Sequence, residues 1–194
     1  MRKSNLFIAV YGINNIGKST QTKMLGDKLS LMGLEAKVIK YPIYDIPSGV
    51  RLNDYLRNKN PEKLTPQEAQ VLYAQNRRDF EENLLDLLEH NIVIAEDYTG
   101  TGIAWGVGAG VDKDLLLSVN SDLLKEDFAI LMDGNRFSSG IESGHKHEND
   151  NPLIKRVREV HLELAKDYGW GIVNANQTPE EVHEDIWGFV SKYV

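Results

Sequence analysis

The chain has 194 residues, of which 41% are hydrophobic and 26% are charged, and it contains no cysteine. This size and balance are typical of a single globular domain with a full core, and they exclude a disulfide framework and a thiolate metal site. The formal net charge of −7 argues against a nucleic-acid partner, so small phosphorylated ligands are the expected partners. No stretch is apolar for long enough to form a signal peptide or a membrane span, and we expect a cytoplasmic protein.

Short β-rich runs alternate with helical periods along the chain, which is the pattern of a parallel sheet wrapped by helices. We expect strands at residues 6–11, 36–41, 91–96, 128–133 and 171–175. We expect helices at residues 18–32, about 50–57, 66–90, 152–168 and 179–194. Thr65 and Thr178 are expected as N-caps, and Glu68 stands where a capping box needs it. The polar segment at about 136–150 is expected to form a lid or a loop.

One motif follows the first β-rich run and opens the first helix. It matches G-x-x-x-x-G-K-[S/T] and consists of Gly12, Ile13, Asn14, Asn15, Ile16, Gly17, Lys18 and Ser19, with Thr20 next. The two glycines allow backbone angles that turn N–H groups toward a phosphate, and the helix N-terminus points its positive end at the same anion. Lys18 can neutralise the β- and γ-phosphate oxygens, and the Ser19 hydroxyl can bind Mg²⁺. The motif predicts a site for a nucleoside triphosphate, which we take to be ATP.

Two carboxylates, Glu96 and Asp97, end the third expected strand, where ligands bind in open α/β sheets. A carboxylate there could hold Mg²⁺ through water or accept a proton from the acceptor group. Asp133, at the end of the fourth strand, is a rival carboxylate for the metal, and position alone does not rank the two sites. Our candidate metal ligands are Ser19, Glu96 and Asp97.

Further motifs follow in order along the chain. They are Tyr41-Pro42 after the second strand, Tyr-Ala-Gln-Asn-Arg at 73–77, Glu-Asp-Tyr at 96–98 and Thr-Gly-Ile-Ala-Trp at 101–105. This order resembles the thymidylate kinases, a family of P-loop nucleoside-monophosphate kinases, and the resemblance covers nearly the whole chain. It implies ATP as phosphoryl donor, Mg²⁺ as cofactor and, by resemblance alone, a homodimer.

The resemblance also implies roles for single residues. Tyr73 would stack on the acceptor base, Arg77 would bind the base edge, and Trp105 would lie against the sugar. The alternatives are that Tyr73 and Trp105 are core residues and that Arg77 forms a surface ion pair with Asp79 or Glu81. The remaining candidates for acceptor binding are Tyr41, Tyr44, Arg51, Asp97 and Tyr98.

Several residues depart from the family pattern. Asn14 replaces an aspartate of the P-loop, and Asp97 replaces the arginine that in the family grips the acceptor phosphate. Like charges repel at contact, so either something else binds that phosphate or the acceptor carries none. The candidates are Arg51, Arg78 or a second magnesium ion held by Glu96 and Asp97, and we favour the metal.

The sequence therefore predicts one P-loop kinase domain over residues 1–194, with a five-stranded parallel α/β sheet flanked by helices and a lid at about 136–150. The expected reaction is ATP-dependent phosphoryl transfer to a deoxynucleoside monophosphate, dTMP to dTDP. The expected catalytic residues are Lys18, Glu96, Arg136 and Lys146. One alternative is a deoxynucleoside kinase in which Glu96 is the base. The other is a pseudo-kinase or nucleotide sensor that binds ATP without transfer.

Overall fold

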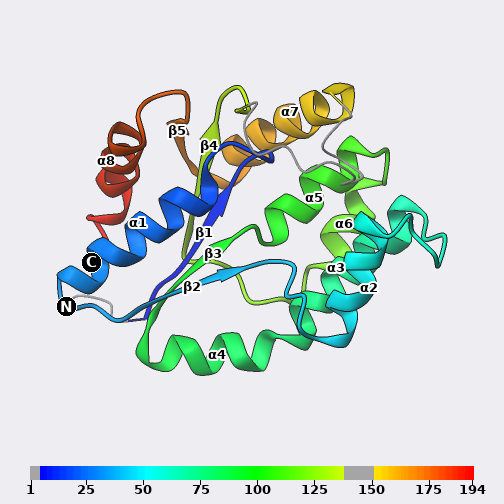
Figure 1. Ribbon diagram of the computed structural model, residues 1–194, viewed down its shortest axis with the longest axis horizontal. Helices are drawn as coiled ribbons and strands as arrows, with labels where there is room; N and C mark the ends of the chain where they lie inside the picture. Colours follow the sequence, from blue (N-terminus) through cyan, green and yellow to red (C-terminus); the bar gives the residue numbers. More distant parts are fainter. Residues whose placement is uncertain (1–4, 138–150) are drawn as a thin grey trace.

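The computed structural model describes residues 5–137 and 151–194, and its centre is a sheet of five parallel strands (Figure 1). The strands are β1 (Phe7–Tyr11), β2 (Ala36–Lys40), β3 (Ile92–Glu96), β4 (Phe128–Asp133) and β5 (Gly171–Asn174). They lie in the order β2-β3-β1-β4-β5, so β1 is the central strand. The predicted fold class is confirmed, and each expected strand forms to within one residue at either end.

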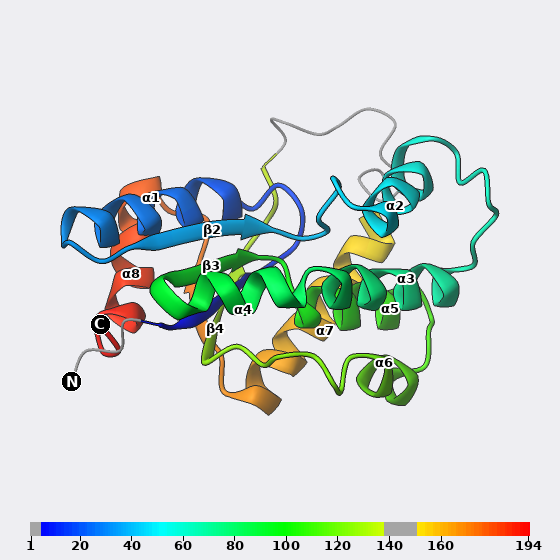
Figure 2. The same cartoon turned by 90° about the horizontal axis from the view of Figure 1, so that it is seen from below.

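Helices cover both faces of the sheet and extend past one of its ends. The helices of the described residues are α1 (Lys18–Leu31), α2 (Pro47–Arg57), α3 (Pro66–Asp79), α4 (Glu81–His90), α5 (Thr99–Gly108), α6 (Lys113–Val119), α7 (Asn151–Tyr168) and α8 (Pro179–Val190). One face is covered by α1 and α8, and the other by α4 and α7 (Figures 1 and 2). Beyond the carboxyl ends of the strands lie α2, α3 and α6, as Figure 2 shows. Among the described residues, no helix has the length and apolarity needed to cross a bilayer.

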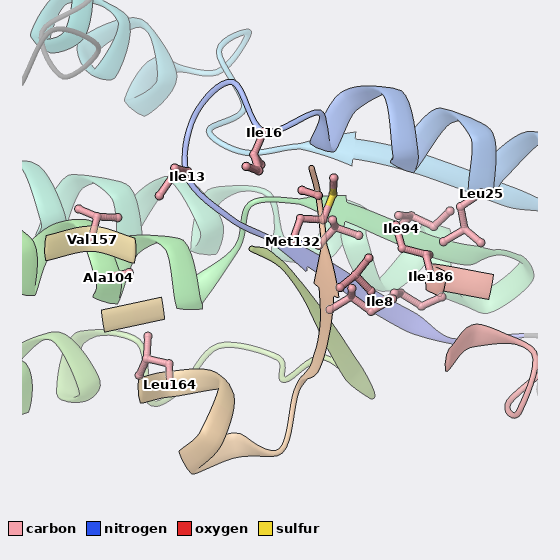
Figure 3. Close-up of a cluster of buried hydrophobic side chains, with 14 of the residues drawn as sticks. Ile8, Ile13, Ile16, Leu25, Ile94, Ala104, Met132, Val157, Leu164 and Ile186 are labelled. Carbon is pink, nitrogen blue, oxygen red and sulfur yellow. The ribbon is translucent and has the colours of Figure 1, made fainter. Parts of the chain in front are cut away.

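Side chains of β1 alternate between the two faces, so each face has its own hydrophobic cluster. Ile8 faces the cluster that contains Leu25 of α1 and Ile186 of α8 (Figure 3). Phe7, which is also buried, faces the opposite cluster, which contains Leu84 of α4. The strand is therefore covered by helices on both faces, as expected for a central parallel strand. This packing holds the end of β1, where the P-loop begins.

The predicted N-caps are confirmed by their hydrogen bonds. The Thr65 hydroxyl accepts from the Glu68 N–H at 3.2 Å, and the Glu68 carboxylate accepts from the Thr65 N–H at 2.8 Å. Thr178 and Glu181 form the same capping box at the start of α8. Each box satisfies backbone donors that a helix leaves unpaired at its first turn.

The expected single helix over residues 66–90 is wrong, because the helix is interrupted at Phe80. Phe80 has φ −105° and ψ 0°, ends α3 and precedes α4. Its ring packs edge-to-face on Tyr41, with 6.2 Å between the ring centroids. The break lets α3 extend past the end of the sheet while α4 packs against β3.

Helix α5 was not expected, because its sequence contains four glycines and glycine disfavours helix. The structure shows why glycine is needed there. A Cβ at Gly106 would lie 2.6 Å from Leu116 of α6, and a Cβ at Gly108 would lie 2.7 Å from Val157 of α7. Close packing by neighbouring helices therefore outweighs the low local propensity. The short helix α6 was not expected either.

Candidate active site

A cleft of about 430 Å³ opens at the carboxyl ends of β2 and β3, beside the loop that follows β1. Its walls come from that loop, from the ends of the two strands and from α2, α3 and α5. The lining residues are Asn14, Asn15, Ile16, Gly17, Lys18, Ser19, Thr20, Lys40, Tyr41, Pro42, Tyr44, Leu56, Arg57, Gln70, Tyr73, Asn76, Arg77, Glu96, Asp97, Thr101, Gly102, Trp105 and Phe137. One cavity thus joins the P-loop to most of the predicted acceptor residues.

The P-loop has a backbone that only certain residues can adopt. Gly12 has φ 148° and Gly17 has φ 92°, both in the region that favours glycine, and Asn15 has φ 58°. A Cβ at Gly12 would also lie 2.7 Å from the Met132 carbonyl oxygen of β4. Gly12 is therefore required by both conformation and space, and Gly17 by conformation.

Lys18 begins α1, and its side chain turns back under the loop. Its ammonium group donates to the carbonyl oxygens of Gly12 at 2.8 Å and Ile13 at 3.0 Å. It also lies 3.6 Å from Asp97 Oδ1, and only 6% of Lys18 is exposed. These contacts hold a positive charge beside the place where the motif predicts the phosphates of a nucleotide.

Ser19, in the first turn of α1, contacts Glu96 at the end of β3. The Ser19 hydroxyl donates to Glu96 Oε1 at 2.9 Å, and Lys40 at the end of β2 pairs with the same oxygen at 2.7 Å. Burial lowers the pKa of Lys40, but the hydrogen bond and charge of Glu96 outweigh that effect, so the pKa lies above its usual value. A hydroxyl beside a carboxylate is the oxygen donor set that Mg²⁺ prefers, and Ser19 and Glu96 fit that ion.

Asp97 follows β3 with φ 62°, an uncommon conformation for a residue other than glycine. Its carboxylate accepts from the Thr101 hydroxyl at 2.7 Å and faces Lys18. Burial raises the pKa of Asp97, Lys18 opposes that rise, and Glu96 adds to it. Glu96 and Asp97 thus each face a lysine of their own. The described residues contain no group of three or more His, Cys, Asp or Glu side chains placed to hold a metal ion. A second magnesium ion held by the two carboxylates alone stays a prediction.

On the acceptor side, Arg77 of α3 is buried, with 4% exposed. It donates to the Tyr98 carbonyl oxygen at 2.8 Å and to Asn120 Oδ1 at 3.2 Å. Burial lowers its pKa below the usual value. The alternative of a surface ion pair with Asp79 or Glu81 is therefore wrong. Tyr73, Trp105 and Tyr41 line the same cleft, which brings the predicted base and sugar residues together.

Three of the predicted residues lie elsewhere, and a fourth is not described. Arg51 pairs with Glu62 through two nitrogens, at 3.0 and 2.7 Å, outside the cleft. The Tyr98 ring is buried in the core, 5.0 Å from the Phe7 ring between centroids, so Tyr98 contributes its carbonyl oxygen to Arg77. Arg136 does not line the cleft, although the next residue does. Lys146 and residues 138–150 of the expected lid lie outside the described residues.

The two rivals named from sequence have other partners. Asp133 forms a bidentate ion pair with Arg158 of α7, at 2.7 and 2.9 Å, and does not line the cleft. Arg78, a candidate for the acceptor phosphate, pairs with Asp122 at 2.6 Å. Neither residue reaches the cleft, because each points from its helix or strand toward a different neighbour.

Several cleft residues were not identified from the sequence. Asn76 holds the segment after β2, because its side chain exchanges two hydrogen bonds with the Ile43 backbone, at 2.8 and 2.9 Å. Its place inside the motif at 73–77 is a signal that could have singled it out. Lys40, Arg57 and Gln70 carry no such signal, since only the fold brings them to the cleft.

A phosphate loop after the central strand of a parallel sheet, facing a second binding surface across one cleft, defines a P-loop phosphotransferase. Comparison with known proteins narrows this class. The family model described as thymidylate kinase matches residues 10–186, and the chain belongs to the thymidylate kinase family.

Relatives and a solved structure agree with this membership. The thymidylate kinase of Dictyostelium discoideum is 27% identical over 190 residues, which cover 96% of this chain and 85% of the relative. The thymidylate kinase of Schizosaccharomyces pombe is 26% identical, with 95% of this chain and 90% of the relative covered. A solved structure of the thymidylate kinase of Candida albicans superposes with a TM-score of 0.84 at 27% identity and covers 97% of this chain and 92% of that one.

Proposed function

We propose that this chain transfers the γ-phosphoryl group of ATP to dTMP and forms dTDP. The observation that carries the proposal is the continuity of one cleft from the P-loop to Tyr73, Arg77 and Trp105. Membership in the thymidylate kinase family over nearly the full chain supports the same reaction. Small nucleotides are then the partners. Homodimerisation and a cytoplasmic location stay predictions, from the resemblance and from the absence of cysteine.

In this proposal the P-loop binds the donor phosphates through its backbone N–H groups, and Lys18 neutralises charge on the transferring group. Ser19 and Glu96 would hold Mg²⁺, which when bound offsets the negative charge of the donor phosphates. The protein needs no covalent intermediate, because phosphoryl transfer depends mainly on positioning and on charge stabilisation. The roles of Arg136 and Lys146 in that stabilisation stay predictions.

The acceptor base would lie between the aromatic side chains and Arg77. Tyr73 offers a ring face for stacking, and Trp105 forms a wall beside the sugar. The Arg77 guanidinium is already fixed by the Tyr98 carbonyl oxygen and by Asn120, so it can bind a base edge without further ordering. Preorganisation of this kind favours one acceptor orientation over others.

The test is ADP release measured with ATP, Mg²⁺ and one acceptor at a time: dTMP, dUMP, dCMP, GMP, AMP and thymidine. We expect dTMP to give the highest kcat/KM, with the Lys18→Ala variant as the inactive control. A wild-type protein that uses GMP or AMP but not dTMP would refute the base assignment.

A deoxynucleoside kinase is the second candidate, and it rests on one observation. Glu96 and Asp97 both line the cleft, and the family's arginine is absent at position 97. A carboxylate beside a sugar hydroxyl could act as its base. Preference for thymidine over dTMP in the same assay would favour this reading.

A further inference from the structure

The acceptor phosphate carries up to two negative charges and needs a cation to bind it. The described residues that line the cleft include four cationic side chains: Lys18, Lys40, Arg57 and Arg77. Asp97 occupies the position of the family's phosphate-binding arginine, and a carboxylate at contact would repel a phosphate. Among the described residues of the cleft, these four cations are the side chains that could neutralise the acceptor phosphate.

Three of the four lie at other parts of the cleft. Lys18 donates to two carbonyl oxygens of the P-loop and belongs to the donor side. Arg77 is held deep in the cleft by the Tyr98 carbonyl oxygen and by Asn120, at the base end. Lys40 forms an ion pair with the buried Glu96.

Arg57 stands on a different wall, in the last turn of α2. Its Nη1 donates to the Tyr44 hydroxyl at 3.0 Å and to Asn53 Oδ1 at 3.2 Å. Its guanidinium also lies over the Tyr44 ring, 5.2 Å from the centroid. Asn53 is one helical turn before Arg57, so the helix itself holds the guanidinium beside Tyr44.

Tyr44 connects this pair to the rest of the cleft. Tyr44 and Tyr73 pack against the same small buried cluster between α2 and α3, and both line the cleft together with Lys40 and Arg57. The Arg57–Tyr44 pair therefore lies on the same wall of the cleft as the expected base platform at Tyr73. A mononucleotide whose base stacks on Tyr73 can place its phosphate beside this pair.

We propose that Arg57, together with the Tyr44 hydroxyl, binds the phosphate of the acceptor nucleotide. The inference rests on the proposed function and deepens it, because it makes the acceptor a monophosphate rather than a nucleoside. The planar guanidinium can donate two parallel hydrogen bonds to phosphate oxygens. The Tyr44 oxygen accepts from Arg57 and can still donate its own proton to the same phosphate.

The test compares two arginines on one helix. Arg57→Gln removes the proposed contact, and Arg57→Lys keeps the charge but loses the planar pair of N–H donors. Arg51→Gln is the matched control, since Arg51 pairs with Glu62 outside the cleft. For each variant we would measure KM for dTMP and for ATP, and the Kd of dTMP and of thymidine by calorimetry. Thermal melting checks that each variant is folded.

Loss of a charged hydrogen-bond donor from a phosphate should raise the dTMP KM of Arg57→Gln by about 10- to 100-fold. The KM for ATP and the Kd of thymidine should not change, because neither ligand places a phosphate at Arg57. Arg57→Lys should recover part of the loss, and Arg51→Gln should behave as the wild type.

An unchanged dTMP KM in Arg57→Gln overturns the inference, as does equal weakening of dTMP and thymidine. Wild-type protein that binds thymidine as tightly as dTMP overturns it as well. Failure of the wild type to phosphorylate dTMP refutes the proposed function instead. If the wild type phosphorylates dTMP and Arg57→Gln has the same KM for dTMP, only the role of Arg57 is refuted.

Discussion

Gly102 of α5 faces the guanidinium of Arg77, and an alanine there tests how the cleft is built. A Cβ at position 102 would lie 2.7 Å from Arg77 Nη2 and 3.2 Å from Nη1. The guanidinium is buried and donates to the Tyr98 carbonyl oxygen, so it has to move away from that partner. Gly102→Ala therefore perturbs the acceptor site without removing any functional group.

Two opposing effects set the size of the change. Alanine in place of glycine inside a helix stabilises by about 1 kcal/mol through backbone propensity. Displacement of a buried charged donor from its acceptor costs about 1.5–3 kcal/mol. We therefore expect a net loss of about 0.5–2 kcal/mol in the free energy of unfolding, with a fall in Tm of a few degrees.

Gly188→Ala is the matched control, because Gly188 lies within α8 and a Cβ there meets nothing within 4 Å. It should gain up to about 1 kcal/mol from propensity. Urea unfolding measures both variants, and Gly102→Ala should also raise the dTMP KM while the ATP KM stays unchanged. The reasoning is refuted if Gly102→Ala is stabilised as much as Gly188→Ala and keeps the wild-type dTMP KM.

Three further predictions concern other parts of the molecule. Lys18→Ala should abolish transfer in the ADP-release assay and lower Tm slightly, since Asp97, 3.6 Å away, loses its nearest cation; wild-type turnover would contradict this. Burial, aided by the charge of Lys18, lowers the pKa of His161 from 6.5 to about 3. As pH falls, His161 is therefore protonated in the unfolded chain before it is protonated in the folded protein. Unfolding free energy should therefore decline by up to about 1.4 kcal/mol per pH unit between these two values, and His161→Leu should flatten that decline in urea titrations; an identical slope in the variant would contradict it. Thr178→Ala removes the cap of α8 and should cost about 1 kcal/mol without changing either KM, whereas an unchanged Tm would show that the capping box is not stabilising.

The features that the sequence predicts well are those set by local chemistry. The P-loop is recognisable because Gly12, Gly17 and Lys18 are required by backbone conformation and by charge within a few residues of one another. The three inner strands β1, β3 and β4 are recognisable because helices cover both of their faces and each is a nearly continuous apolar run. The capping boxes are recognisable because the two residues of each box are only three positions apart in the sequence.

The features that it misses depend on contacts between distant segments. The glycines of α5 do not favour a helix by themselves, and only the approach of Arg77, Leu116 and Val157 shows that they belong to a packed helix. Arg51 and Arg57 are equally basic residues of one helix. Six positions apart at 3.6 residues per turn, they lie about a third of a turn from one another. That rotation puts Arg57 in the cleft and Arg51 against Glu62 outside it, and no sequence pattern gives the orientation of α2.

The position of β1 has a consequence for how the protein is made. This strand is synthesised before the other four, yet it is the central strand, with Phe7 opposite Val93 of β3 and Ile8 opposite Phe128 of β4. A growing chain that has not yet reached β4 cannot pair β1 on both edges. Contacts over such long sequence separations also make folding slow. The segment that forms the nucleotide-binding loop is therefore translated before β4, and β1 is paired on both edges only once β4 has been made. Until then the apolar residues of β1 stay partly uncovered.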